Sequence, residues 1–272
     1  MPELPEVEVV RRALEGEIKG LTITDIKIKY PNIILDDIEE FRCNVLSKKI
    51  ISMDRLGKFL IFNLNEGNLV SHLRMEGKYF YVKKDSMDNK HIHVIFYFDN
   101  GYMLCYQDVR KFGRICYKSN CDLYTTEPLS NVGIDLTKNK DYDLDLLYKK
   151  ITSRKTPIKT TLLDQSIIAG LGNIYVDEVL FLSKLNPHMD SNKITKKDLK
   201  NILSHSLDCF LKSIECGGTT IRSYTSSLGV IGHNQDNLLV HTKEACPVCG
   251  SKIIKDKTNG RGTYYCPKCQ KL

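Results

Sequence analysis

Apolar residues recur at helical spacing near the start of the chain. They occupy four positions that fall on one face of a 3.6-residue period, Val7, Val10, Leu14 and Ile18. Gly20 follows them as a stop signal. The pattern predicts an amphipathic helix packed on a core.

The pattern changes to that of β-strands from Leu21 to about Lys118. Ile26 and Ile28 alternate with polar residues, and three later runs are rich in aromatic and β-branched residues, Lys58–Leu64, Lys78–Val82 and His91–Phe98. The sequence Asp99-Asn100-Gly101 after the last run is a strong hairpin-turn signal. Short strands at this spacing predict an antiparallel β-sandwich.

The second half of the chain is predicted to be helical. Helices are expected over Leu162–Leu182 and Asp190–Ile214, separated at Asn186-Pro187. A Gly/Ser/Thr-rich stretch, Gly217 to Gly232, is a candidate flexible loop. We therefore expect an α+β protein with a β-sandwich domain and N-terminal helix (1–118), a polar connection (119–156), a helical domain (157–240) and a C-terminal metal-binding segment (241–272).

Charge is concentrated at the C-terminal end. The chain has 40 Lys and Arg against 33 Asp and Glu, and residues 243–272 hold seven basic residues against two acidic ones. A basic end is typical of a polyanionic partner such as nucleic acid. No stretch approaches the roughly 20 apolar residues of a membrane span, and the acidic amino terminus does not resemble a signal peptide. A cytoplasmic location is expected.

Four of the ten cysteines form two C-x-x-C pairs. Cys246 and Cys249 are separated from Cys266 and Cys269 by sixteen residues, a spacing typical of a structural four-cysteine zinc ribbon. Two disulfides are the alternative, and they fit a reducing compartment badly. The other six cysteines are expected to be buried apolar side chains.

The segment between the cysteine pairs, Ser251 to Tyr265, should form a hairpin with Asn259-Gly260 at its turn. Arg261 would then lie at the hairpin tip. A basic tip on a metal-braced hairpin suits contact with a phosphate groove, although a solvated surface arginine is the ordinary alternative.

The amino terminus offers a candidate nucleophile. Met1 precedes the small residue Pro2, so processing exposes a secondary amine. An α-amino group has a pKa of about 7.7–8.0, and a Schiff base on a secondary amine is a permanently charged iminium. Glu3 beside it could exchange a proton with a sugar ring. The ordinary alternative is that proline and glutamate simply begin a helix.

A series of motifs along the whole chain resembles bacterial formamidopyrimidine-DNA glycosylase. The motifs are Met1-Pro-Glu-Leu-Pro-Glu-Val-Glu8, Leu56-Gly-Lys58, His72-Leu-Arg-Met-Glu-Gly77, Asp108-Val-Arg-Lys-Phe-Gly113, Leu162-Leu-Asp-Gln165, Ala169-Gly-Leu-Gly-Asn-Ile-Tyr175, Gly217-Gly-Thr-Thr220 and the zinc ribbon. The resemblance implies a bifunctional DNA glycosylase and AP lyase of base-excision repair that removes oxidised purines such as 8-oxoguanine and formamidopyrimidines. It also implies that the helical domain (157–240) is a helix–two-turns–helix DNA-binding domain followed by a zinc-ribbon finger (241–272). One structural zinc, damaged duplex DNA as partner, no nucleotide cofactor, a monomeric enzyme and association with the nucleoid are implied as well.

The resemblance also implies catalytic roles. Pro2 would attack C1′ of the damaged nucleotide, Glu3 would be the acid/base group, and Glu6 a supporting carboxylate. Lys58 matches the lysine that assists base departure and β-elimination. Arg261 matches the finger arginine assigned to δ-elimination.

DNA contacts follow in the same way. Met75, Arg110 and Phe112 match the residues that enter the base stack when the lesion is flipped out, although Met75 and Phe112 taken alone would be assigned to the core. Further DNA-binding positions are His91, Lys155 and Asn173, with Asn173 at a helix N-terminus. His91 has a neighbour on the same strand face, His93, which leaves that assignment open.

Two departures lie near the expected lesion-capping loop. The family's Tyr-Gly-Arg before the first zinc cysteine is replaced by Val240-His241-Thr242, and its Gly-x-Phe-Gln by Gly232-His233-Asn234-Gln235. Both concern recognition of the base rather than catalysis. The alternatives are an endonuclease VIII type enzyme for oxidised pyrimidines, which usually has Gly at the position of Leu4, and a zinc-ribbon DNA-binding protein without catalysis.

Overall fold

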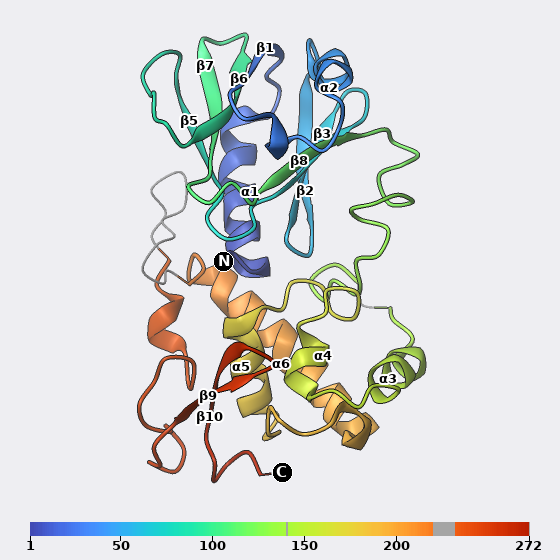
Figure 1. The fold of residues 1–272 in the computed structure, drawn as a ribbon, viewed down its shortest axis with the longest axis vertical. Coiled ribbons are helices and arrows are strands. Elements are labelled where there is room, and N and C mark those ends of the chain that lie inside the picture. The colour runs from blue at the N-terminus through green and yellow to red at the C-terminus, as the bar shows by residue number, and fades with distance from the viewer. Residues whose placement is uncertain (140, 220–231, 272) are drawn as a thin grey trace. The chain divides into compact units, whose positions relative to one another are not determined.

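The computed structural model describes residues 1–139, 141–219 and 232–271, and their backbone divides into two compact units. The N-terminal unit is formed by residues 1–131 with Gly217–Thr219 and Gly232, and the C-terminal unit by residues 132–216 and the chain from His233 onward. Figure 1 shows the elements of each. None of the helices in these ranges is long and apolar enough to cross a membrane.

Two four-stranded antiparallel sheets build the N-terminal unit (Figure 1). One has the order β1 (Ile23–Ile28), β6 (Ile92–Phe98), β7 (Tyr102–Gln107) and β5 (Lys78–Lys83), and the other β2 (Ile50–Leu56), β3 (Phe59–Leu64), β4 (Asn68–His72) and β8 (Arg114–Lys118). Side chains from both sheets meet in one hydrophobic core. The predicted antiparallel sandwich is confirmed.

The helix α1 (Leu4–Ile18) buries the four predicted apolar residues in this same core. Gly20, with φ 89°, turns the chain after it. The strand prediction missed a short 3-10 helix, η1 (Pro31–Ile33), and α2 (Ile38–Val45), which begins where the Asp37 side chain accepts the backbone N–H groups of Glu39 and Glu40. A helix this short leaves little periodic signal.

The C-terminal unit contains α3 (Leu144–Thr152), α4 (Ile158–Leu162), α5 (Asn173–Leu182), α6 (Lys196–Glu215), two 3-10 turns, η2 (Ser191–Lys193) and η3 (Asn234–Asn237), and the hairpin β9 (Ile254–Thr258) with β10 (Arg261–Tyr265). The hairpin and its turn at Asn259 and Gly260, both with positive φ, match the prediction.

One predicted helix was wrong over its first part. The chain from Leu163 to Gly172 is a turn, and α5 begins only at Asn173. The Gln165 side chain holds this turn, because its Oε1 accepts the N–H of Gly170 and its Nε2 donates to the carbonyl of Leu171. The apolar residues of this segment had the spacing of a helix, but side-chain hydrogen bonds hold the backbone in a turn instead.

The prediction for the six scattered cysteines was only partly right. Cys105 and Cys116 are buried, Cys209 and Cys216 are half-buried, and Cys43 and Cys121 are exposed; all six are free thiols. Burial raises the pKa of Cys105 to about 11 and that of Cys116 to about 12, which keeps both as neutral apolar groups.

A buried ion pair fastens α1 to the hairpin of β2 and β3. The Arg55 guanidinium, 2% exposed, donates through Nε to Glu8 Oε2 and through Nη1 to the carbonyl of Gly57, each at 3.0 Å. Arg11 and Arg12 donate to the other oxygen of Glu8 at 2.9 and 2.7 Å. This network joins the first helix of the chain to the turn that carries Lys58.

Opposing effects act on the Glu8 carboxyl. Burial alone would raise its pKa, but hydrogen bonds from Arg11 and Arg12 and the charge of Arg55 outweigh burial and lower the pKa to about 2. The stabilisation is therefore complete above the ordinary pKa of 4.5 and is lost as the pH falls toward about 2.

We predict that Glu8→Gln lowers the free energy of unfolding at neutral pH by about 3 kcal/mol, because it leaves the buried Arg55 without its carboxylate. Urea denaturation measures the difference. The difference in free energy of unfolding between variant and wild type should become smaller as the pH falls through the acid range. Glu17→Gln, an exposed change on the same helix, is the control and should have little effect; a gap independent of pH would contradict the role given to Glu8.

Candidate functional site

The amino terminus is buried against its own helix. Pro2 is buried, and Glu3 and Glu6 are 2% and 5% exposed. Glu3 and Glu6 form a capping box in which Glu6 Oε2 accepts the backbone N–H of Glu3 at 2.8 Å. Pro2 is thereby held directly before a helix N-terminus and beside two carboxylates.

Glu6 has a second contact that links distant parts of the sequence. Its Oε1 accepts the backbone N–H of Thr219 at 2.8 Å. Gly218 lies against Glu6 with φ 84°, and a Cβ there would lie 3.3 Å from Glu6 Cγ. A glycine is needed at this position, so Glu6 ties the start of the Gly217–Gly232 stretch to the N-terminal end of α1. Residues 220–231 of that stretch lie outside the described residues.

Lys58 lies in the tight turn between β2 and β3 and is 5% exposed. Gly57 takes φ 55° there, and its carbonyl accepts from Arg55. Burial, followed by the positive charges of Arg74 and Lys58, lowers the pKa of His72 to about 3. His72 therefore stays neutral beside the lysine.

The loop after β7 presents Arg110 and Phe112. Both are exposed, Phe112 to 48%, and the Arg110 guanidinium lies 4.8 Å from the Phe112 ring centroid. The fully buried Asp108 shapes the loop, because its carboxylate accepts the N–H groups of Arg110, Phe112 and Gly113 at 2.8–3.0 Å. An exposed Phe112 on a fixed loop departs from the core assignment that the residue alone would receive.

Met75 belongs to the turn after β4 and is 36% exposed. Tyr106 joins this turn to the Arg110 loop, since its hydroxyl would collide with a Cβ placed on Gly77 and with one placed on Gly113. Only glycine fits at both positions. The buried tyrosine therefore sets the spacing between Met75 and Phe112.

The two histidines of the His91 region differ in their surroundings. His93 is 3% exposed, and its Nε2 lies 2.7 Å from the carbonyl of Asp108. His91 is half-buried, and its backbone N–H donates to the Asn89 side chain. His93 is thus occupied in supporting the Arg110 loop, which favours His91 as the DNA contact.

Three further predicted residues lie in the C-terminal unit. Asn173 is the first residue of α5, after Gly172, and its Oδ1 has no hydrogen-bond partner among the described residues. Lys155 is exposed just before α4, and Arg261 is exposed at the hairpin tip. Their positions fit contact with phosphates, the first at a helix N-terminus.

The root of the hairpin is held by a buried charge network that the sequence analysis missed. Lys159 Nζ donates to Asp177 Oδ1 at 2.8 Å, to the carbonyl of Gly262 at 2.7 Å and to Thr263 Oγ1 at 3.0 Å. His241 Nδ1 lies 2.8 Å from the other oxygen of Asp177. A charged pair within the apolar run of α5, Asp177-Glu178, was the available signal.

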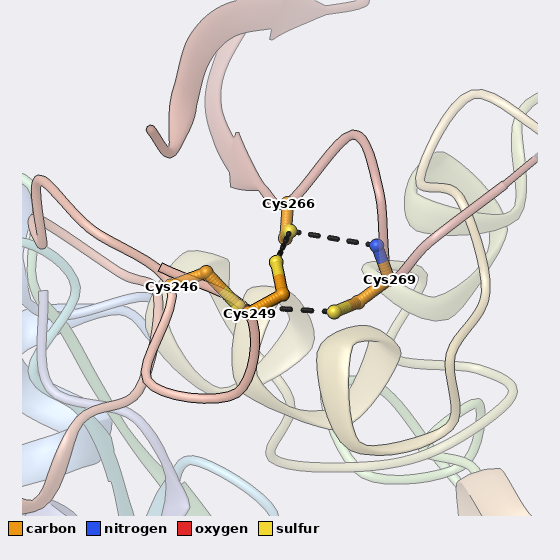
Figure 2. Close-up of side chains that lie close together, drawn as sticks. All are labelled: Cys246, Cys249, Cys266 and Cys269. Carbon is orange, nitrogen blue, oxygen red and sulfur yellow. Dashed lines mark hydrogen bonds between the residues drawn. The ribbon is translucent and has the colours of Figure 1, made fainter. Parts of the chain in front are cut away.

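The four cysteines of the C-x-x-C pairs converge (Figure 2). Their sulfur atoms lie within 4.8 Å of one another, with 3.5 Å between Cys249 and Cys266 and 3.8 Å between Cys246 and Cys269. Tetrahedral zinc with Zn–S bonds of about 2.3 Å needs sulfurs about 3.8 Å apart. The four thiolates therefore fit one structural zinc ion.

Family models match three consecutive parts of the chain. Residues 1–115 match the formamidopyrimidine-DNA glycosylase N-terminal domain, residues 132–225 the H2TH domain of the same enzymes, and residues 243–272 the zinc finger found in FPG and IleRS. The formamidopyrimidine-DNA glycosylase of Oceanobacillus iheyensis is 44% identical, covering 99% of this chain and 98% of the relative. That of Streptococcus mutans is 42% identical over the whole of both chains.

Solved structures give the same result. A Lactococcus lactis FPG variant in complex with DNA containing Fapy-dG has a TM-score of 0.93 and 39% identity over all of both chains. The Lactococcus lactis Fpg with DNA containing an abasic site has a TM-score of 0.92 and 40% identity, covering 99% of this chain and 100% of that one.

We predict that the purified protein holds one zinc per chain and that Cys266→Ser removes it, because three thiolates no longer close the tetrahedral site. Mass spectrometry of the metal measures the content. The variant should lose DNA binding while the N-terminal unit stays folded. Cys43→Ser, an exposed thiol outside the cluster, is the matched control and should keep its zinc; DNA binding by the metal-free Cys266→Ser protein would contradict the role of the finger.

Proposed function

The chain belongs to the formamidopyrimidine-DNA glycosylase family, and from this premise we propose how its own residues carry out the reaction. It is a base-excision repair enzyme, a DNA glycosylase and AP lyase. Its substrates are oxidised purines in duplex DNA, 8-oxoguanine and formamidopyrimidines. The observation that carries the proposal is the buried Pro2 beside Glu3, with Lys58 held by the same N-terminal unit. Its partner, damaged DNA, further implies association with the nucleoid.

Pro2 is the proposed nucleophile. Once Met1 is removed, the lone pair of the secondary amine attacks C1′, and the electrons of the glycosidic bond leave with the base, which takes up a proton. Lys58 assists departure of the base, and Glu3 protonates the sugar-ring oxygen O4′. The C1′–O4′ bond then breaks as the nitrogen lone pair, freed when the attacking amine loses its proton, forms the C1′=N⁺ double bond. The product is an iminium ion joining Pro2 to C1′.

The iminium then promotes strand cleavage. Loss of a proton from C2′ expels the 3′ phosphate, and a second elimination expels the 5′ phosphate, which Arg261 contacts. Hydrolysis frees Pro2. Glu6 supports the pocket by holding Thr219 and the N–H of Glu3.

The lesion must leave the stack before this attack. We propose that Met75 and Phe112 fill the space that the flipped base leaves in the stack and that Arg110 hydrogen-bonds the orphaned cytosine. These contacts offset the free energy that unstacking the base costs. His91, Lys155 and Asn173 bind phosphates. The zinc held by the four cysteines is structural and braces the hairpin that carries Arg261.

Borohydride trapping tests the nucleophile. With a duplex containing 8-oxoguanine opposite cytosine, we expect a reduced adduct whose sugar remnant maps to the N-terminal tryptic peptide, Pro2–Arg11. Glu3→Gln should lower the rate of base release about 10²–10⁴-fold, the range for loss of a general acid or base. Glu17→Gln on the same helix should have no such effect.

Other outcomes would contradict the proposal. A remnant on the peptide containing Lys58 would move the nucleophile, and the absence of any adduct would remove the covalent mechanism. A relative from Lactococcus lactis has been solved with DNA containing an oxidised pyrimidine, so a duplex with such a lesion is the comparison substrate. Faster excision of that lesion would favour the pyrimidine specificity of the alternative enzyme type.

A further inference from the structure

An open pocket of about 420 Å³ lies in the N-terminal unit beside the loop that carries Arg110 and Phe112. It is formed by the end of β1, the start of β6, the segment before β6 and this loop. Its lining residues are Lys29, Tyr30, Asp88, Asn89, Lys90, Ile92, His93 and Lys111. None of these has a role in the reaction proposed above.

The pocket carries a positive charge. Lys29 pairs with Asp88 at 2.6 Å, and this hydrogen bond and the charge of Lys29 lower the pKa of the Asp88 carboxyl. Lys90 and Lys111 have no carboxylate partner within the described ranges. Two ammonium groups in one pocket without counter-charge favour an anionic ligand.

Lys111 connects the pocket to the Arg110 loop. It has φ 57°, and its ammonium lies 4.4 Å from the Tyr30 ring centroid. Tyr30 packs on the His93 ring at 5.5 Å, and His93 Nε2 contacts the carbonyl of Asp108. The residues that shape the exposed loop thus also form the wall of the pocket, which fixes the distance between the two.

We propose that this pocket binds a backbone phosphate of the duplex next to the step opened by Phe112, with Lys90 and Lys111 as the donors. The inference rests on the proposed function, since it assumes that the loop enters DNA. Lysine is a compact point charge suited to a phosphate oxygen. The pocket is open to solvent, so a phosphate of a continuous strand can enter it.

The dependence of DNA affinity on salt tests the phosphate contacts. Removal of one lysine–phosphate contact should reduce the slope of log K against log [salt] by about 0.9. We expect Lys90→Gln and Lys111→Gln each to reduce the slope by about this amount, and the double variant to reduce it by about twice as much. Binding is measured by fluorescence anisotropy with a duplex that carries a tetrahydrofuran abasic-site analogue, which offers no base to excise. Lys111→Arg should restore the wild-type slope. Lys19→Gln, an exposed lysine at the end of α1 and outside the pocket, is the matched control.

The outcomes separate this inference from the proposed function. If the wild-type protein forms no borohydride adduct with damaged DNA, the proposed function fails whatever the lysines do. If the adduct forms and the double variant keeps the wild-type slope, the phosphate pocket fails alone. A change in lesion cleavage by Lys111→Gln without a change in slope would also overturn it, because Lys111 would then act only through the conformation of the loop.

Discussion

The arrangement of the N-terminal unit depends on one buried ion pair, Glu8 with Arg55. The reactive amine of such an enzyme is at a chain end, which has no neighbouring residue on one side to hold it. The Arg55 guanidinium donates one hydrogen bond to Glu8, on the helix that follows Pro2, and another to the carbonyl of Gly57, next to Lys58. One guanidinium thus holds both the helix that follows Pro2, the proposed nucleophile, and the turn that carries Lys58, and its fork of donors suits two acceptors in a fixed direction.

In the C-terminal unit, too, a buried charged side chain joins a helix to a hairpin, with different residues. The Lys159 ammonium joins Asp177 of α5 to the carbonyl of Gly262, one residue from Arg261. Replacing a whole buried pair of this kind with packed apolar side chains often costs little net stability, because desolvation offsets the attraction, whereas removing one partner alone is strongly destabilising. They fix one geometry instead, and the two networks lie next to Lys58 and Arg261, both proposed to act in the reaction.

The sequence alone predicted the parts of the fold that depend on a regular spacing of residues along the chain. The face of α1, the sandwich and the zinc hairpin depend on local patterning, and all were predicted. The turn at Gln165, the short α2 and the supporting residues Glu8 and Arg55 were not predicted, because each depends on a partner distant in the chain or on side-chain hydrogen bonds. The catalytic residues themselves were assigned through the resemblance, since Pro2 and Glu3 alone look like an ordinary helix start.

The same contacts explain the departures from the family pattern. His241, which stands in the replaced Tyr-Gly-Arg segment, has its imidazole Nδ1 2.8 Å from an Asp177 carboxylate oxygen and its ring in a T-shaped arrangement with Tyr264. Its backbone N–H donates to Glu178. His233 donates its backbone N–H to the carbonyl of Cys216. His241 therefore contacts the root of the finger, whereas His233 is held at the end of α6. The His241 contacts thus bear on how the hairpin with Arg261 is fastened. The residues proposed to act at C1′, Pro2, Glu3 and Lys58, belong to the N-terminal unit.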